Sequence, residues 1–130
     1  MESVFQKTIL IVDDEERNRR LLEVFASADG YRTLSATTGE QGLLLARNEL
    51  PDLVLLDLMM PGMDGFEVAR ILKGQAETAG IPLIVVSSLD DAASRGRMQV
   101  SGIDKILTKP IDRWLLSRAI AELIQGARAR

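Results

Sequence analysis

Three short, continuously apolar runs constrain the fold of this chain more than any other feature of its sequence. They are ILIV at 9–12, LVLL at 53–56 and LIVV at 83–86. Each run is too short for a helix, carries β-branched residues and is bounded by turn or polar residues, which is typical of a strand buried on both faces of a sheet. YRTLSA at 31–36 alternates polar and apolar residues and DKIL at 104–107 is half polar, so these segments are predicted to be edge strands.

Helical patterns fill the intervals between the predicted strands. The first helix is expected to end at Asp29-Gly30, because glycine readily adopts the left-handed backbone that closes a helix. Further helices are predicted over 39–48 behind an N-cap at Thr37 or Thr38, over about 65–73, over 90–101, and from about 112 to Gly126. The segment 90–101 has few apolar positions, so we expect it to be the least firmly packed helix.

The alternation of strands and helices predicts the fold class. Five strand-then-helix units indicate an α/β fold with a mostly parallel sheet and helices on both faces. With three buried strands in the centre and two at the edges, the order is 2-1-3-4-5, the flavodoxin-like doubly wound arrangement. Right-handed crossovers then place the reversal of direction between the first and third strands, where such sheets bind their ligands. The 130 residues are predicted to form a single domain, 1–130, with a core over about 8–125.

The residue composition excludes several classes of protein. The chain has no cysteine and no histidine, with 19 acidic and 16 basic side chains and a formal net charge of -3. Disulfides, thiolate or imidazole metal sites and catalysis by Ser-His-Asp or Cys-His pairs are therefore excluded. The charge balance argues against nucleic acid as a direct partner, and no apolar run is long enough to span a bilayer. The N-terminal segment lacks the pattern of a secretory signal, so we expect a cytoplasmic protein.

Carboxylates follow two strands that are neighbours in the predicted sheet. The first strand runs into Asp13 and Asp14, and the third ends on Asp57. Two carboxylates about 5 Å apart repel by roughly 3 kcal/mol at an effective dielectric near 20, so three of them are costly without a cation. Oxygen ligands favour Mg2+. The alternatives are that Asp14 only caps the following helix and that Asp57 is only a turn residue.

A hydroxyl and an ammonium are expected beside this acidic cluster. The fourth strand ends on Ser87 and the fifth leads into Lys109-Pro110. A strand-end serine is usually a turn former and a lysine there is usually a solvated charge. In the predicted order, however, both fall beside Asp57. The set suits a phosphoryl group, because a metal and a lysine neutralise its charge, a hydroxyl binds one oxygen and a carboxylate attacks phosphorus.

Four motifs in the same order resemble the receiver domain of two-component response regulators. They are ILIVDDE, PDLVLLDLMMPGMDG, PLIVVSS and ILTKPID, and the resemblance covers residues 8 to about 125. It implies that Asp57 accepts a phosphoryl group from a phosphohistidine on a sensor histidine kinase or a histidine phosphotransfer protein. It also implies that Asp14, Asp57 and the backbone carbonyl of Met59 bind Mg2+ directly, while Asp13 acts through water.

The same resemblance assigns roles to the remaining site residues. It implies that Ser87 contacts a phosphoryl oxygen, that Lys109 pairs with the phosphate and that the Lys109-Pro110 bond is cis. One position departs from the family, since Ile106 stands where receivers usually carry tyrosine or phenylalanine, three residues before the lysine. The aromatic part of the family's switch is therefore in question, whereas phosphorylation of Asp57 needs no such ring.

A signalling switch is the expected function, rather than an enzyme that acts on a separate substrate. Phosphorylation is predicted to pull Ser87 inward and to shift the helix at 90–101, which changes the face formed with the strand at 104–107 and the last helix. That face is the candidate surface for an output domain, an output protein or a homodimer. No DNA-binding helix pair or catalytic domain follows, so the chain is expected to be a free-standing receiver or one cut from a longer protein.

Proteins of other classes share parts of this pattern. A flavin carrier, an aspartate-based phosphatase and a nucleotide hydrolase are disfavoured, since the first strand ends in DDEE, Met59 replaces the phosphatase's second acid and no G-x-x-x-x-G-K-[ST] stretch occurs. The remaining alternative is a phosphorylation-independent protein-interaction module of the same fold. Met59, Met60 and Met63 are predicted only to pack. Trp114 is predicted to pack on the last helix, with a partner contact as the alternative.

Overall fold

The computed structural model describes residues 6–88 and 102–128, and these form alternating strands and helices. The strands are β1 (Thr8–Val12), β2 (Arg32–Ala36), β3 (Leu53–Asp57), β4 (Leu83–Ser87) and β5 (Lys105–Thr108). The helices are α1 (Glu16–Ala28), α2 (Gly39–Glu49), α3 (Gly65–Gly74) and α5 (Arg113–Arg128). The helix predicted over 90–101 lies outside the described residues.

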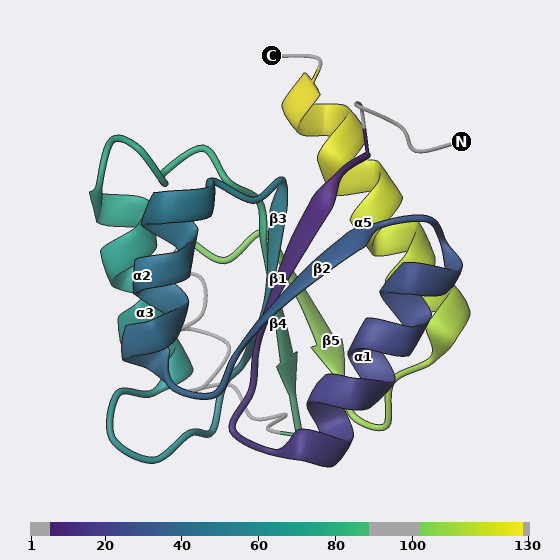
Figure 1. The fold of residues 1–130 in the computed structure, drawn as a ribbon, viewed down its shortest axis with the longest axis horizontal. Helices are drawn as coiled ribbons and strands as arrows, with labels where there is room; N and C mark the ends of the chain where they lie inside the picture. Colours follow the sequence, from purple (N-terminus) through teal and green to yellow (C-terminus); the bar gives the residue numbers. More distant parts are fainter. Residues whose placement is uncertain (1–5, 89–101, 129–130) are drawn as a thin grey trace.

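The five strands form one parallel sheet in the order β2-β1-β3-β4-β5. This confirms the doubly wound arrangement, including the reversal between β1 and β3. Figure 1 shows α2 and α3 on one face of the sheet and α1 and α5 on the other. In the same view β1 begins and α5 ends at one end of the sheet, and all strands run toward the other end. That other end holds the carboxyl ends of the strands.

Two apolar layers hold the helices onto the sheet. Alternate residues of each central strand point to opposite faces, so Leu10 and Val12 of β1 pack toward α2 and α3, while Ile9 and Ile11 pack toward α1 and α5. All five residues of β3 and all five of β4 are buried. Every residue of β5 is exposed or half-buried, and only Ala36 of β2 is buried. The central and edge positions predicted for these strands are therefore confirmed.

The helix ends follow local hydrogen bonding. The Thr38 side chain accepts from the Gln41 backbone N–H at 3.1 Å and so caps α2, which decides between the two predicted threonines. At the end of α1, Gly30 has a φ of +90°, the left-handed conformation expected there. The last helix passes Gly126 and ends at Arg128, two residues beyond its predicted end. Within the described ranges, no helix has both the length and the apolar character that crossing a membrane requires.

Two predicted packing roles are wrong. Trp114 is 69% exposed and Met59 is 60% exposed, whereas Met60 is buried and Met63 packs against the core as predicted. The buried stripe of α5 contains Leu116, Ala119, Ile120 and Ile124. Trp114 precedes the first of these by two positions, which turns its side chain about 200° around the helix axis. The tryptophan therefore faces away from the core.

Candidate functional site

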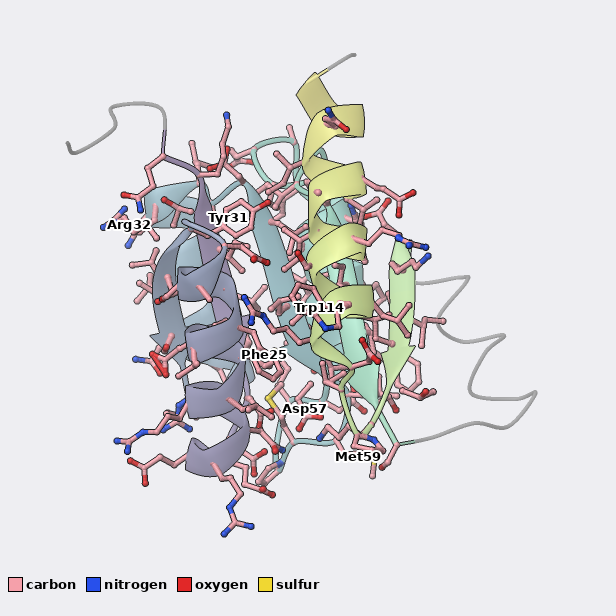
Figure 2. All side chains as sticks on the ribbon, turned by 90° about the vertical axis from the view of Figure 1, so that its right-hand side faces the viewer. Phe25, Tyr31, Arg32, Asp57, Met59 and Trp114 are labelled. Carbon is pink, nitrogen blue, oxygen red and sulfur yellow. The ribbon has the colours of Figure 1, made fainter. Side chains whose placement is uncertain are left out.

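Three carboxylates meet at the carboxyl ends of β1 and β3. Asp13 and Asp14 follow β1, Asp57 ends β3, and one oxygen of each lies within 4.8 Å of the others. Asp13 and Asp57 are 1% and 6% exposed, while Asp14 is exposed. Figure 2 shows Asp57 and Met59 together at this end of the sheet. The structure thus brings together the three acids predicted to converge.

Backbone contacts fix Asp13 in this cluster. Its N–H donates to the carbonyl of Ala36 at 3.1 Å, and its Oδ1 accepts from the Glu15 N–H at 2.9 Å. Arg19, on α1, donates from Nη1 to the Asp13 carbonyl at 3.0 Å. The N-cap of α1 is Glu15, so the alternative that Asp14 merely caps this helix is wrong.

The second oxygen of Asp13 tests whether the cluster suits a cation. This Oδ2 atom is buried and has no hydrogen-bond partner among residues 6–88 and 102–128. A buried carboxylate oxygen without a donor is costly unless a cation or a water bound to a cation satisfies it. The donor set consists of carboxylates, which are the ligands that Mg2+ prefers. The residues present therefore fit a magnesium ion.

Burial shifts the ionisation of both buried acids. Desolvation raises the pKa of Asp13 to about 6, against a lowering by its hydrogen bond from Glu15, and the charge of Asp57 raises it further. Desolvation also raises the pKa of Asp57, and the hydrogen bond and charge of Lys109 oppose that rise. A positive charge nearby would therefore stabilise the ionised form of both carboxyl groups.

Lys109 supplies one such charge. Its Nζ lies 3.1 Å from Asp57 Oδ1, and its side chain is 29% exposed. The backbone N–H of Lys109 donates to the carbonyl of Ser87 at 2.9 Å, which ties the end of β5 to the end of β4. The Lys109-Pro110 bond is cis, as expected. The lysine is therefore paired with Asp57 rather than merely solvated.

Ser87 and Ile106 occupy the positions expected of them in the sheet. Ser87 ends β4 and is 1% exposed, and it follows Val86, the register partner of Asp57. Ile106 lies on β5 and is 36% exposed. The phosphoryl contact of Ser87 and the carbonyl ligand of Met59 stay predictions.

Gly65 and Arg19 support the site, and the sequence reasoning missed both. A Cβ on Gly65 would lie 2.6 Å from the carbonyl oxygen of Asp57 and 2.8 Å from the Leu58 Cα, so only glycine allows α3 to begin this close to the phosphoacceptor candidate. A glycine directly after the capping residue Asp64 was the available signal for close approach. Arg19 had no signal in the sequence, because its partner is a backbone carbonyl.

The comparisons with known proteins identify the family. Residues 9–121 match the response regulator receiver domain family. The chain belongs to this family. The receiver is 44% identical to the response regulator PleD of Caulobacter vibrioides over 115 residues, which are 88% of this chain and 25% of PleD. It thus spans about a quarter of that relative. It is 38% identical to the protein PilH of Pseudomonas aeruginosa over 118 residues, or 91% of this chain and 98% of PilH.

Solved receiver structures share this fold. The receiver domain of a signal transduction histidine kinase from Syntrophus aciditrophicus is 32% identical, with a TM-score of 0.87 over 92% of this chain and 91% of its own. The receiver domain of the sensor histidine kinase PA1611 from Pseudomonas aeruginosa is 26% identical, with a TM-score of 0.86 over 92% and 98%. That structure holds a magnesium ion in its active-site cleft. Receiver domains work in two-component signalling and partner with histidine kinases or phosphotransfer proteins.

Proposed function

We propose that this receiver accepts a phosphoryl group on Asp57 from the phosphohistidine of a sensor histidine kinase or a histidine phosphotransfer protein. The observation that carries the proposal is the buried Asp57 carboxylate, 3.1 Å from the Lys109 ammonium and within the cluster completed by Asp13 and Asp14. A nucleophile and the cation that its phosphorylated form needs are thereby held together at the end of a central strand.

Asp14, Asp57 and the backbone carbonyl of Met59 would hold Mg2+, with Asp13 acting through water. The ion would supply positive charge against the phosphoryl oxygens. The buried Oδ2 of Asp13, for which the described part of the chain offers no hydrogen-bond donor, supports this assignment.

The chain's own residues divide the transfer among them. A carboxylate oxygen of Asp57 attacks phosphorus in line, the bond from phosphorus to the imidazole nitrogen breaks, and the nitrogen leaves with the electron pair. Lys109 moves from pairing the carboxylate to pairing a phosphoryl oxygen. The Ser87 hydroxyl donates to another oxygen. Burial of Asp57 and Ser87 limits access of water to the product.

The proposed readout lies on the side of β5 and α5. When Ser87 moves toward the phosphoryl group, the end of β4 and its partner strand β5 adjust with it, because Lys109 N–H donates to the Ser87 carbonyl. Ile106, Trp114 and Leu115 are exposed on these elements, at 36%, 69% and 55%. An output domain, an output protein or a second copy of the chain would respond there.

Phosphorylation by acetyl phosphate tests the assignment of Asp57. With Mg2+ present, the wild type should gain one phosphoryl group by intact mass, and Asp57→Asn should gain none. Asp64→Asn is the matched control, because Asp64 caps α3 through its Oδ1 and asparagine can make the same bond. Labelling of Asp57→Asn at the wild-type rate would refute the assignment. No uptake and no Mg2+ binding by the wild type would favour a phosphorylation-independent interaction module.

A further inference from the structure

A cavity of about 410 Å³ adjoins the acidic cluster, between α1 and the loop that joins β5 to α5. Its apolar walls include Leu21 and Leu22 from α1 and Ile111 from the loop. Asp13 and Lys109 form its polar end, and Asn18 adds an amide side chain. The transfer described above uses Asp13 and Lys109 but leaves the apolar walls without a role.

We propose that this cavity receives the apolar group of a small acyl phosphate, so that the receiver prefers donors with an aromatic or branched acyl group over acetyl phosphate. The inference rests on the proposed function, since it names a class of donor for the same phosphoacceptor. It makes Leu21 and Ile111 specificity-determining residues and leaves the reacting atoms unchanged.

The cavity is continuous with the reacting centre. Lys109 lines it and also places Nζ 3.1 Å from Asp57 Oδ1. Asp13 lines it and belongs to the cluster whose oxygens lie within 4.8 Å of one another. Val86, another lining residue, is the register partner of Asp57 on the neighbouring strand. A donor with its phosphoryl group at Asp57 can therefore extend its acyl group past Lys109 into the cavity.

The size and chemistry of the cavity fit such a group. Ligand pockets for small molecules typically have volumes of about 300–1,000 Å³ and are lined by apolar side chains with a few polar groups, as here. The methyl of acetyl phosphate would leave most of this space unfilled. A phenyl ring would cover the side chains of Leu21, Leu22 and Ile111. The amide of Asn18 can donate to the acyl oxygen.

The transfer itself balances without a further reactant. A carboxylate oxygen of Asp57 forms the new bond to phosphorus, and the bond from phosphorus to the bridging oxygen of the donor breaks. The acyl carboxylate leaves with the electron pair, so neither a proton nor an oxidant is needed. Lys109 lines the cavity, where its positive charge can offset the negative charges of Asp13 and of the departing carboxylate.

Two residues of α1 offer a matched test. Leu21 and Val24 lie one turn apart and are exposed to similar degrees, 43% and 58%. Leu21 lines the cavity, whereas Val24 does not belong to its lining within the described part of the chain. Serine at either position removes an exposed apolar side chain, so the two variants lose comparable stability. Only Leu21→Ser removes a wall of the cavity.

The experiment compares benzoyl phosphate with acetyl phosphate as donors to Asp57, with Mg2+, in the wild type, Leu21→Ser and Val24→Ser. One apolar group in a fitted pocket changes kcat/KM by about tenfold or more, so the ratio of benzoyl to acetyl should fall about tenfold in Leu21→Ser. It should stay within twofold in Val24→Ser. Ile111→Ser should repeat the fall, which guards against an effect peculiar to Leu21. Circular dichroism verifies that each variant is folded.

Each other outcome has a distinct meaning. An equal ratio in all variants, with Asp57 still labelled, would overturn the inference and leave the proposed function intact. No labelling from either donor would overturn the proposed function and the inference with it. An unchanged ratio together with slower transfer to Leu21→Ser from a phosphohistidine protein would assign the cavity to protein docking, and would also overturn the inference.

Discussion

Strands β3 and β5 each deliver a charged residue to the same site, yet they lie in opposite surroundings. All five residues of β3 are buried, while β5 is an edge strand with every residue exposed or half-buried. Asp57 at the end of β3 is 6% exposed, and Lys109 just after β5 is 29% exposed. The carboxylate is thus held in the buried centre of the sheet, and the ammonium that pairs with it is carried next to an exposed edge strand.

The difference separates the residues that stabilise the fold, in β3, from the residue that tunes the charge of the site, Lys109. Desolvation raises the pKa of Asp57, which is the cost of placing a carboxylate at the end of a core strand. Lys109, which follows the exposed edge strand β5, offsets this cost with its positive charge. Changes at β3 should therefore alter the stability of the fold, whereas changes around Lys109 should alter the chemistry and leave the fold intact.

The largest effect on phosphorylation is expected just after the exposed strand β5. Lys109→Ala should slow phosphorylation of Asp57 by acetyl phosphate about 100-fold, the usual loss when one charge-stabilising group is removed from an active site. Lys105→Ala is the control, since Lys105 is an exposed lysine at the start of β5, the strand that leads into Lys109. Initial rates of mass increase measure both. A fall in the phosphorylation rate of less than threefold in Lys109→Ala would refute the role of Lys109 in the chemistry at Asp57.

Stability should show the reverse order. Leu55 in β3 is 0% exposed and Ile106 in β5 is 36% exposed. Leu55→Ala should lower the free energy of unfolding by about 3 kcal/mol, because it removes a fully buried side chain from the core. Ile106→Ala should lower it by less than about 1 kcal/mol. Urea unfolding followed by circular dichroism measures both losses, and equal losses would contradict the contrast between the two strands.

Asp13 directly follows another buried strand, β1, and its burial should make the stability of the protein depend on pH. Its folded pKa of about 6 lies above the unfolded value of 3.8, so the proton is held more tightly in the folded state. This favourable contribution is complete below pH 4 and is lost as the pH rises through 6. Asparagine cannot ionise. Without Mg2+, the free energy of unfolding of Asp13→Asn should therefore rise by about 2 kcal/mol relative to that of the wild type when the pH is raised from 4.5 to 7.5.

Urea unfolding at the two pH values, with and without Mg2+, measures this gain. Added Mg2+ at pH 7.5 should narrow the difference, because a cation favours the ionised carboxylate of the wild type. An advantage of Asp13→Asn that is the same at both pH values would show that ionisation of Asp13 does not limit stability.

The smallest effect is expected one turn into α1. Arg19→Gln should weaken Mg2+ binding about fivefold, because loss of the hydrogen bond from Nη1 to the Asp13 carbonyl frees the peptide that leads to Asp14. Arg20→Gln is the neighbouring control, since Arg20 is 78% exposed and its Nη2 reaches Glu16 at only 4.0 Å. Calorimetric titration with Mg2+ distinguishes them. Equal affinities in the two variants would remove Arg19 from the support of the site.

Sequence patterns predicted the parts of this molecule that depend on burial along the backbone. Continuous apolar runs identified the central strands β1, β3 and β4, and half-polar segments identified the edge strands β2 and β5. The burial of a strand determines the local pattern of polar and apolar residues, so the sequence shows it directly. The convergence of Asp13, Asp14 and Asp57 followed from strand order alone. Strand order placed Ser87 and Lys109 beside Asp57, and the family resemblance gave them their particular roles. These roles stay proposals, although the contact of Lys109 with Asp57 agrees with them.

The features that the sequence did not predict depend on tertiary contacts. Trp114 is a large apolar residue on an amphipathic helix, yet its place relative to the stripe of Leu116 and Ile120 leaves it exposed. Arg19 contacts a backbone carbonyl, which no side-chain pattern encodes. The apolar cavity is formed by residues of α1 together with Ile111 of the β5–α5 loop, and its existence depends on how these elements pack.

The placement of the two ends of the described chain has a practical consequence. β1 begins and α5 ends at the same end of the sheet (Figure 1), whereas Asp57, the last residue of β3, lies at the opposite end. A linker attached before β1 or after α5 would therefore anchor the protein to a sensor surface with its acidic cluster facing the solution. Biosensor measurements of donor proteins could then use either attachment, and agreement between the two would show that tethering does not hinder docking.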